Sequence, residues 1–397
     1  MQDRILSNYI IPSGIAAYAI LTMYPYFIWG NAFIYKGFFI LYCVVVGLNF
    51  IKKQSIEVSA LVVFVMLVFW VAYAFFPRGE NISFPSAGVI SILLIPFLQR
   101  ELLVRAFVIF RFMYVVILCC SILQYPLIVL GLVEPVGIIE PMGAVKISRG
   151  QFYIDHIFNI ILNDQHLDMY GYSFFRMSSI FDEPGLIGTV SALLLFTYRD
   201  VLVSTKSKFE KVVLYISLFL SFSLGGYCLW FIGRMIDLFI FNRRAFFKNS
   251  VVFFTIVISA LSVVASTEGG QKYIYDRVWN GSSISIKDNR ASDEFDELYS
   301  KQKDDILTLL FGYGKDAHVM TGYDVSSYKG FIYNFGVIGV FFVLLIFSTW
   351  AFAYGNMNAF SMLVFMLVLI NSYQRPIDFN YYYYFIIASV FNRGRYA

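Results

Sequence analysis

The chain has 397 residues, of which 59% are hydrophobic and 14% are charged, and its net charge at neutral pH is +4. This balance excludes an ordinary soluble globular protein, in which about a quarter of the residues are charged. The composition instead indicates a chain whose main solvent is lipid.

Apolar segments of about 20 residues, the length that spans the hydrocarbon core of a bilayer, recur from one end of the chain to the other. We predict about twelve spanning helices, in an all-α polytopic bundle that forms a single membrane domain over residues 1–397. Their approximate centres are residues 9–29, 32–50, 58–76, 85–98, 112–132, 186–198, 212–224, 226–241, 251–265, 330–350, 359–370 and 381–391. The first segment is a full span without a small-residue cleavage site, which indicates a signal anchor.

Basic residues are distributed unevenly between the two sets of connections. The connections and ends on one side hold fifteen Lys and Arg residues, whereas the short connections opposite hold three, Lys36, Arg78 and Arg375. Because short cytoplasmic loops collect Lys and Arg, we predict that the first side, with both termini, is cytoplasmic. Two long segments then lie outside, residues 134–183 and residues 268–329. The outer side carries 14 basic and 20 acidic residues, which argues against nucleic-acid binding.

The first outer segment ends in FFRMSSIFDEPG, which places an arginine, two carboxylates and a Pro-Gly turn before a span. Glu183 has two open interpretations: it caps the following helix, whose positive end favours a carboxylate, or it takes part in a site. Arg176 is likewise either an interfacial anchor or a functional cation. Because ordered chain outside the membrane carries function more often than mere connection, both residues are candidates.

The second outer segment is predicted to contain an amphipathic surface helix. Ser292 can cap this helix, and the first turn is acidic. The apolar residues expected on one face are Phe295, Leu298, Ile306 and Leu309. The helix is expected to stop at the glycines of FGYG, before the chain returns through SSYKGFIYNFGVIG. The alternative is a solvated charged helix that only covers the bundle.

The sequence offers little support for ATP, dinucleotide or metal chemistry. It has no Walker or dinucleotide-binding glycine pattern, and His156, His166 and His318 are neither paired at helical spacing nor joined to a cysteine cluster. We therefore expect no cofactor and no metal centre. Arg234 and Asp237, three residues apart within the eighth span, are expected to pair with each other.

Four motifs of the outer side follow one another in a characteristic order. They are the arginine with its Asp-Glu-Pro turn, LSFSLGGY at an outer helix end, a long loop with an arginine, a helix and FGYG, and the SSYKGFIYNFGVIG return, together about residues 176–339. This order resembles the bacterial O-antigen polymerase (Wzy-type) and O-antigen ligase superfamily. The resemblance implies a GT-C-like bundle in the bacterial inner membrane with two long periplasmic loops.

The resemblance also implies an activity and partners. The expected active site faces the periplasm and joins sugars carried on undecaprenyl pyrophosphate, with inversion at the anomeric carbon and no sugar-nucleotide donor. The implied partners are the undecaprenyl-pyrophosphate-linked oligosaccharide donor and acceptor, membrane lipid and a polysaccharide chain-length regulator, without nucleic acid.

Residues of the outer loops receive roles from the same resemblance. A pyrophosphate leaving group develops negative charge, which the planar donor fork of a guanidinium stabilises, and Arg176 and Arg290 stand at the matching positions. A carboxylate or imidazole must accept the proton of the attacking sugar hydroxyl, and the candidates are Glu183 and His318. Further substrate-binding candidates are Arg277, Lys315 and Tyr328.

The chain departs from the family pattern at two places. Members often carry an arginine where this chain has Leu224, and ligases place a histidine before the return helix, where this chain has Ser326, Ser327 and Tyr328. The second departure favours a polymerase over a ligase. A flippase or other transporter of lipid-linked sugars, which would place ionisable groups at mid-membrane, stays open as an alternative. A non-catalytic scaffold, in which loss of the outer arginines would be silent, also stays open.

Overall fold

The computed structural model describes residues 9–53, 57–76, 78, 84–142, 146–147, 149–169, 172–198, 205–243, 246, 255, 291–323, 325, 327–353, 358–375 and 379–393. The chain divides into two compact units. The first unit comprises Met1–Val116, Arg199–Leu202 and Ala291–Ala397, and the second comprises Ile117–Tyr198 and Val203–Arg290. The single membrane domain expected over residues 1–397 stays a prediction.

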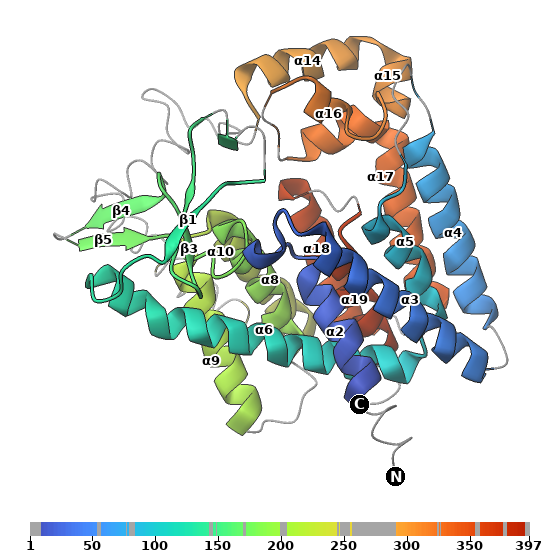
Figure 1. Cartoon of the computed structure of the whole chain (residues 1–397). Helices are drawn as coiled ribbons and strands as arrows, with labels where there is room; N and C mark the ends of the chain where they lie inside the picture. Colours follow the sequence, from blue (N-terminus) through green and yellow to red (C-terminus); the bar gives the residue numbers. More distant parts are fainter. Residues whose placement is uncertain are drawn as a thin grey trace. The chain divides into compact units, whose positions relative to one another are not determined.

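The described part of the first unit is helical (Figure 1). Its elements are α2 (Ile11–Leu21), η2 (Tyr26–Ile28), α3 (Ala32–Lys53), α4 (Val58–Phe75), α5 (Ala87–Leu94), η3 (Ile95–Phe97), the first half of α6 (Arg100–Val129), α14 (Asp293–Asp304), α15 (Ile306–Phe311), α16 (Ala317–Met320), α17 (Tyr328–Ala353), α18 (Ala359–Gln374) and α19 (Tyr381–Arg393).

The second unit combines helices with short strands. Its described elements are the second half of α6, β1 (Gly137–Ile139), β2 (Tyr153–Asp155), β3 (Ile160–Leu162), β4 (His166–Met169), β5 (Tyr172–Phe175), α8 (Pro184–Phe196), α9 (Thr205–Leu220) and α10 (Leu224–Phe241).

A helix lies at each predicted span except the ninth, residues 251–265, which falls outside the described residues apart from Thr255. Within the described part of the chain, five helices are long and apolar enough to cross a membrane: Phe33–Ile51, Val58–Phe75, Arg100–Val129, Leu224–Phe241 and Tyr328–Ala353. These helices support a polytopic membrane protein, because a helix satisfies its own backbone hydrogen bonds in lipid. The number twelve and the sides of the loops stay predictions.

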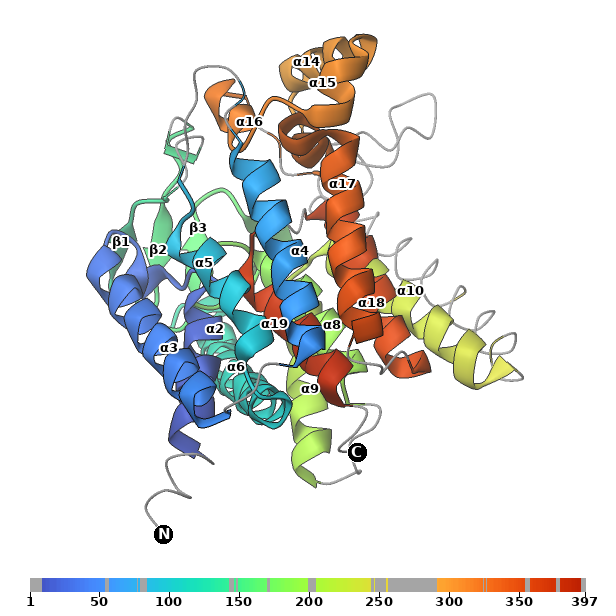
Figure 2. The same ribbon diagram turned by 90° about the vertical axis from the view of Figure 1, so that its right-hand side faces the viewer.

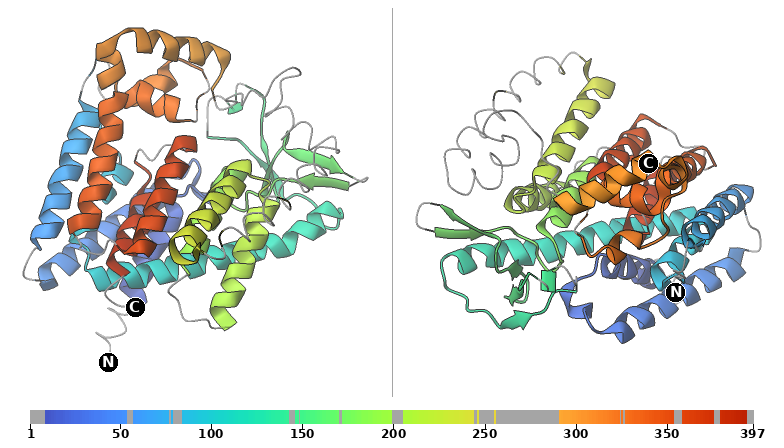
Figure 3. Two further views of the ribbon diagram at one scale, coloured as in Figure 1. Left: turned by 180° about the vertical axis from the view of Figure 1, so that it is seen from behind. Right: turned by 90° about the horizontal axis from the view of Figure 1, so that it is seen from above.

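In the first unit, α4 and α17 lie side by side in Figure 1, Figure 2 and Figure 3. The indole of Trp70 in α4 is fully buried, with its ring centre 5.2 Å from that of Phe335 and 6.0 Å from that of Phe331. The helix α17 is interrupted at Gly336, where φ is 63° and ψ is −173°. A predicted spanning segment therefore contains one residue of non-helical backbone.

In the second unit, α8 lies at the centre of the helical core, and all 13 of its residues are buried. Helix α10 packs against it where Gly226 meets Gly188, and a Cβ atom on Gly226 would lie 2.7 Å from the carbonyl carbon of Gly188. Small residues allow two helix backbones to approach this closely. Ser223 caps α10, since its Oγ accepts a hydrogen bond from Gly226 N at 3.2 Å. Arg234 and Asp237 pair at 2.7 Å on the same helix, as predicted.

The first outer segment contains two antiparallel sheets that the sequence did not predict. One has the order β1-β2-β3, with Ile154 placed opposite Ile138 on one side and Ile161 on the other. The other pairs β4 with β5 and sets His166 opposite Phe175. An all-α chain was therefore the wrong expectation for this segment. Strands of three or four residues are too short to show a period-two hydrophobic pattern.

The second outer segment begins as predicted and then differs. Ser292 Oγ accepts a hydrogen bond from Phe295 N at 3.2 Å, so the expected cap is present. The single helix was wrong, because Asp305 leaves the helical region with φ −107° and ψ 112° and caps the separate helix α15. The single apolar face was also wrong: Phe295 is fully buried, whereas Ile306 is 69% exposed. The helix stop at Gly312 is confirmed.

Candidate functional site

The chain between β5 and α8 is held by hydrogen bonds to its neighbours in the second unit. Met177 N donates to Leu220 O, at the end of α9, over 2.9 Å. Ile160 N donates to Ser179 O over 2.9 Å, and Ser179 adopts a positive φ of 55°. Arg176 therefore projects from backbone that is held on its C-terminal side, and binding groups need such support to be placed precisely.

This arrangement brings together two motifs of the sequence. Leu220, which accepts the bond from Met177, is the first residue of LSFSLGGY, and Tyr227 is its last. Arg176 is half-buried, and its charge acts on the phenol of Tyr227. The Tyr227 hydroxyl donates to Phe219 O at 2.6 Å. The planar donor fork of a guanidinium suits the oxygens of a phosphate.

Asp182 is fastened by two side chains of the same outer segment. Its Oδ1 atom lies 2.8 Å from Lys146 Nζ and 2.6 Å from the hydroxyl of Tyr153. Lys146 also donates to the Tyr153 hydroxyl at 2.8 Å. Burial, with the charge of Asp182, raises the pKa of the Tyr153 phenol well above its ordinary range, so this group stays a neutral donor. Asp182 is thus an anchor for the turn that precedes α8.

Glu183 occupies the N-cap position of α8, with φ −140° and ψ 135°, but its side chain makes no capping hydrogen bond. The expected position at the start of the helix is therefore confirmed, without a side-chain hydrogen bond, and the carboxylate sits at the positive end of the helix. It is half-buried, and its charge acts on the buried phenol of Tyr153. This carboxylate remains the candidate base within the second unit.

In the first unit, His318 of α16 is fastened to a buried amide of α17. The backbone N of His318 donates to Asn334 Oδ1 at 2.9 Å. The ring atom Nδ1 of His318 lies 2.8 Å from Asn334 Nδ2 and 3.1 Å from Asn334 Oδ1. Asn334 is 4% exposed, whereas the histidine is half-exposed. One nitrogen of the imidazole is thus engaged by the protein.

The two glycine motifs of the first unit, FGYG and IYNFG, meet backbone to backbone. Tyr313 N donates to Tyr333 O at 2.9 Å, and Gly314 N donates to Asn334 O at 2.8 Å. Gly312 and Gly336 both have positive φ, and a Cβ atom on either would overlap the backbone of the other motif. Glycine is required here both for its conformation and for its lack of a side chain.

Tyr73 near the end of α4, and Arg78 shortly after it, donate hydrogen bonds to backbone carbonyl groups of the two glycine motifs. Arg78 Nη1 donates to Asn334 O at 3.2 Å and to Phe311 O. The Tyr73 hydroxyl donates to Phe335 O at 2.6 Å. In the sequence, Arg78 stood out only as one of three basic residues in short outer loops. No local signal could have identified this role, because the two carbonyl groups that it binds in FGYG and IYNFG lie more than 230 residues away along the chain.

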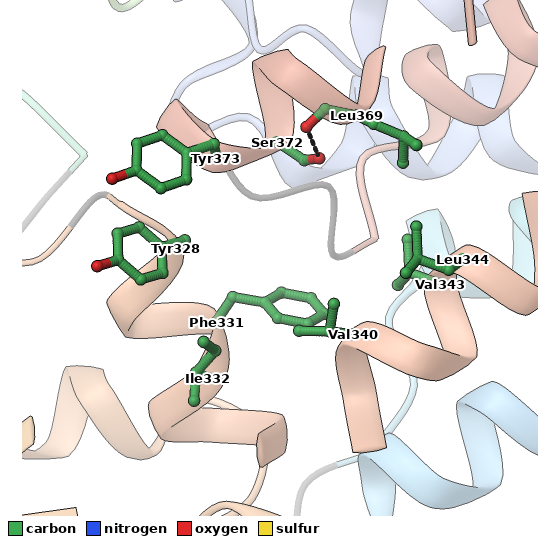
Figure 4. A pocket seen from close by; sticks show the side chains of 9 residues that line it. All are labelled: Tyr328, Phe331, Ile332, Val340, Val343, Leu344, Leu369, Ser372 and Tyr373. Carbon is green, nitrogen blue, oxygen red and sulfur yellow. Dashed lines mark hydrogen bonds between the residues drawn. The ribbon is translucent and has the colours of Figure 1, made fainter. Parts of the chain in front are cut away.

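Lys315 and Tyr328 also belong to the first unit. Lys315 already pairs with the neighbouring Asp316 at 2.5 Å. Tyr328 stacks on Tyr373 of α18, with ring centres 4.6 Å apart. Both tyrosines line a pocket of about 270 Å³ whose other walls are mainly apolar side chains of α17 and α18, among them Phe331 (Figure 4).

The remaining two candidates, Arg277 and Arg290, lie outside the described residues. Of the other candidates, Arg176 and Glu183 belong to the second unit, and His318, Lys315 and Tyr328 belong to the first. Among the residues that the structure describes, no group of three or more His, Cys, Asp or Glu side chains is arranged to hold a metal ion.

Comparison with known proteins adds no assignment. No protein-family model matches the chain, and no curated protein is significantly similar to it.

Proposed function

We propose that the protein is a glycosyltransferase that polymerises undecaprenyl-pyrophosphate-linked repeat units of O-antigen, or of a related polysaccharide, at the periplasmic face of the inner membrane. The observation that carries the proposal is the interruption of α17 at Gly336, with His318 fastened to Asn334 beside it. Non-helical backbone at membrane depth is tolerated where it is buried in protein or lines a polar cavity, and it is typical of sites for hydrophilic ligands.

The motif contacts support the same proposal. The Arg176 segment lies against LSFSLGGY within the second unit, and FGYG lies against IYNFG within the first. All four motifs are those that resemble the O-antigen polymerase superfamily. If the four motif matches had arisen by chance, the motifs would not be expected to pack against one another in pairs. Their contacts are expected if the motifs serve a shared function.

The proposed reaction is an inverting glycosyl transfer. The hydroxyl oxygen of the acceptor sugar forms a bond to the anomeric carbon of the donor sugar, and the bond from that carbon to the pyrophosphate oxygen breaks with its electron pair. The hydroxyl proton passes to a protein base, and undecaprenyl pyrophosphate leaves. In this scheme Arg176 stabilises the departing pyrophosphate, and Glu183 is the candidate base. Arg277 and Arg290 keep the substrate-binding and catalytic roles that the sequence suggested.

A lipid-linked oligosaccharide flippase is the second candidate, because secondary transporters also use interrupted membrane helices. A purified protein in proteoliposomes, supplied with an undecaprenyl-pyrophosphate-linked oligosaccharide, separates the two. Longer lipid-linked chains on a gel support the polymerase. Movement of the oligosaccharide across the membrane at unchanged chain length supports the flippase.

Arg176→Ala tests the binding role in the same assay. Loss of a charge-assisted contact made mainly in the transition state should lower the rate about a hundredfold or more, and Arg176→Lys should recover only part of it. Arg149→Ala is the matched control, since Arg149 is an exposed arginine of the same outer segment. Near-normal polymer from Arg176→Ala at normal protein level would refute the pyrophosphate contact.

Glu183→Gln tests the base, because the amide keeps the shape of the side chain but cannot accept the proton. An inactive variant supports the base. Full activity would make Glu183 structural. In a strain that lacks the gene, one O-unit per lipopolysaccharide core indicates lost polymerisation, whereas absence of all O-units indicates lost ligation or flipping. An unchanged ladder would refute the proposal.

A further inference from the structure

His318 makes three short contacts with a single amide group, and these contacts favour one of the two neutral forms of the ring. The starting point is the backbone N–H of His318, which can only donate. It points to Asn334 Oδ1 at 2.9 Å, so the oxygen of this amide must face α16. The backbone N–H of His318, whose hydrogen has a fixed position, therefore sets the orientation of the Asn334 amide.

With the oxygen placed, the other end of the amide is its NH₂ group, which can only donate. This nitrogen is also the nearer of the two amide atoms to the imidazole, at 2.8 Å from His318 Nδ1 against 3.1 Å for the oxygen. We take the shorter contact, with Asn334 Nδ2, as the hydrogen bond, so that Nδ1 is the acceptor. A neutral imidazole has one accepting nitrogen and one N–H, so its proton then resides on Nε2.

The joint between FGYG and IYNFG keeps this amide in place. Asn334 is buried, its carbonyl oxygen accepts from Gly314 N at 2.8 Å and from Arg78 at 3.2 Å, and the adjacent Gly336 leaves no room for a side chain. Nε2 itself bonds to no other residue in the described part of the chain, and the His318 side chain is half-exposed. The available group of this histidine is therefore an N–H donor.

We infer that His318 serves as a hydrogen-bond donor to an oxygen of the lipid-linked substrate, with Asn334 as the positioning residue that selects the Nε2–H form. The inference rests on the proposed function for the identity of the substrate, but not for the protonation of the ring. It replaces the role of general base that the sequence allowed for His318. An N–H that faces a pyrophosphate or sugar oxygen stabilises charge on that oxygen and takes no proton from it.

The protonated nitrogen can be observed directly, because the chain contains only 3 histidines. Protein labelled with ¹⁵N-histidine and reconstituted in liposomes gives three imidazole signals by solid-state NMR, and the one lost in His318→Gln belongs to His318. At a pH where the ring is neutral, we expect Nδ1 to be the unprotonated nitrogen and Nε2 to carry the hydrogen. A protonated Nδ1 would overturn the inference and restore His318 as a candidate base.

Asn334→Asp is the matched change at the positioning residue. A carboxylate has no N–H and can only accept, so it should draw the proton to Nδ1 and reverse the assignment in the NMR spectrum. Asp is close to Asn in size, so the joint should keep its packing. An unchanged Nε2–H form in this variant would show that Asn334 does not select the protonation state.

Chain elongation in proteoliposomes tests the role of the donor. A glutamine places an amide N–H near the position of Nε2, so His318→Gln should lose less than about tenfold in rate, whereas His318→Ala should lose about a hundredfold. His166→Gln is the control at a histidine to which we assign no role. Equal losses in His318→Gln and His318→Ala would overturn the donor role. If wild-type protein elongates no chains, the proposed function fails, and the NMR assignment still decides the protonation of His318.

Discussion

At the scale of single residues, Tyr153 holds the turn that leads into α8. Tyr153→Phe removes the hydroxyl that donates to the Asp182 carboxylate and accepts from Lys146. Loss of a buried hydrogen bond to a charged group typically costs about 1–3 kcal/mol, so the variant should unfold at a lower temperature. Thermal unfolding of the purified protein in detergent measures the change. Tyr172→Phe is the control, because Tyr172 is 52% exposed, and an equal loss in both variants would contradict the anchoring role.

His156 is predicted to make stability depend on pH. Burial lowers the pKa of its imidazole below the ordinary value of 6.5, an effect that Asp155 only partly offsets. Below about pH 6.5 the imidazole of His156 therefore binds a proton more readily in the unfolded chain than in the folded protein. As a result, the free energy of unfolding falls as the pH falls. Above that pH both states are neutral at this residue, and its contribution to the pH dependence vanishes.

The measurement is the unfolding temperature of wild-type protein and of His156→Gln from about pH 5 to about pH 8. The wild type should lose stability on the acid side, and the variant, whose amide does not titrate, should lose less. An identical decline in both proteins would assign the acid sensitivity to other groups.

At the scale of elements, the packing of α10 on α8 depends on two glycines. Gly226→Ala would place a methyl group 2.7 Å from the backbone of Gly188, which neither helix can relieve by a change of rotamer. Overpacking of this kind typically costs about 1–3 kcal/mol, so the variant should unfold at a lower temperature or accumulate less.

Gly47→Ala in α3 is the matched control for this prediction. Nothing lies within 4 Å of a Cβ atom added at Gly47, so the change should be neutral or stabilise the helix by up to about 1 kcal/mol. Normal stability of Gly226→Ala would show that the two helices can separate there without loss.

At the scale of the whole molecule, the charge distribution predicts which segments face the periplasm. A reporter that is active only in the periplasm should work when fused near Gln165 or Ser300, and should fail near Lys208 or Arg244. The reason is the excess of basic residues in one set of connections, fifteen against three in the short segments opposite. The signals of the four fusions provide the measurement. Reversed signals would overturn the orientation and, with it, a substrate presented at the outer face.

Much of the helical plan could be predicted from the sequence, because its causes are local. An apolar run long enough to span lipid must form a helix, since only a helix satisfies its own backbone in a membrane, and the described helices lie at the expected places. The cap at Ser292 and the stop at Gly312 depend on one side chain and one backbone angle, and both are present. The pairing of Arg234 with Asp237 follows from helical spacing alone.

The candidate site could be predicted only in part, because its contacts join distant segments of the chain. The sequence identified Arg176 and His318 as candidates. It did not identify the carbonyl of Leu220, which holds the segment next to Arg176, or the amide of Asn334, which contacts the imidazole of His318. Arg78 binds the carbonyl groups of Phe311 and Asn334, which lie more than 230 residues away, so no periodicity or motif indicates this role.

The sequence by itself determined that this chain carries apolar helices long enough to span a membrane, with polar motifs between them, because length, apolar content and helical spacing are local properties. Only the tertiary structure decided that the short strands form sheets, that Asp182 is bound by Lys146 and Tyr153, and that the His318 ring lies against the amide of Asn334. These features are hydrogen bonds between groups that come together only on folding. Their geometry depends on the whole packed unit rather than on neighbouring residues.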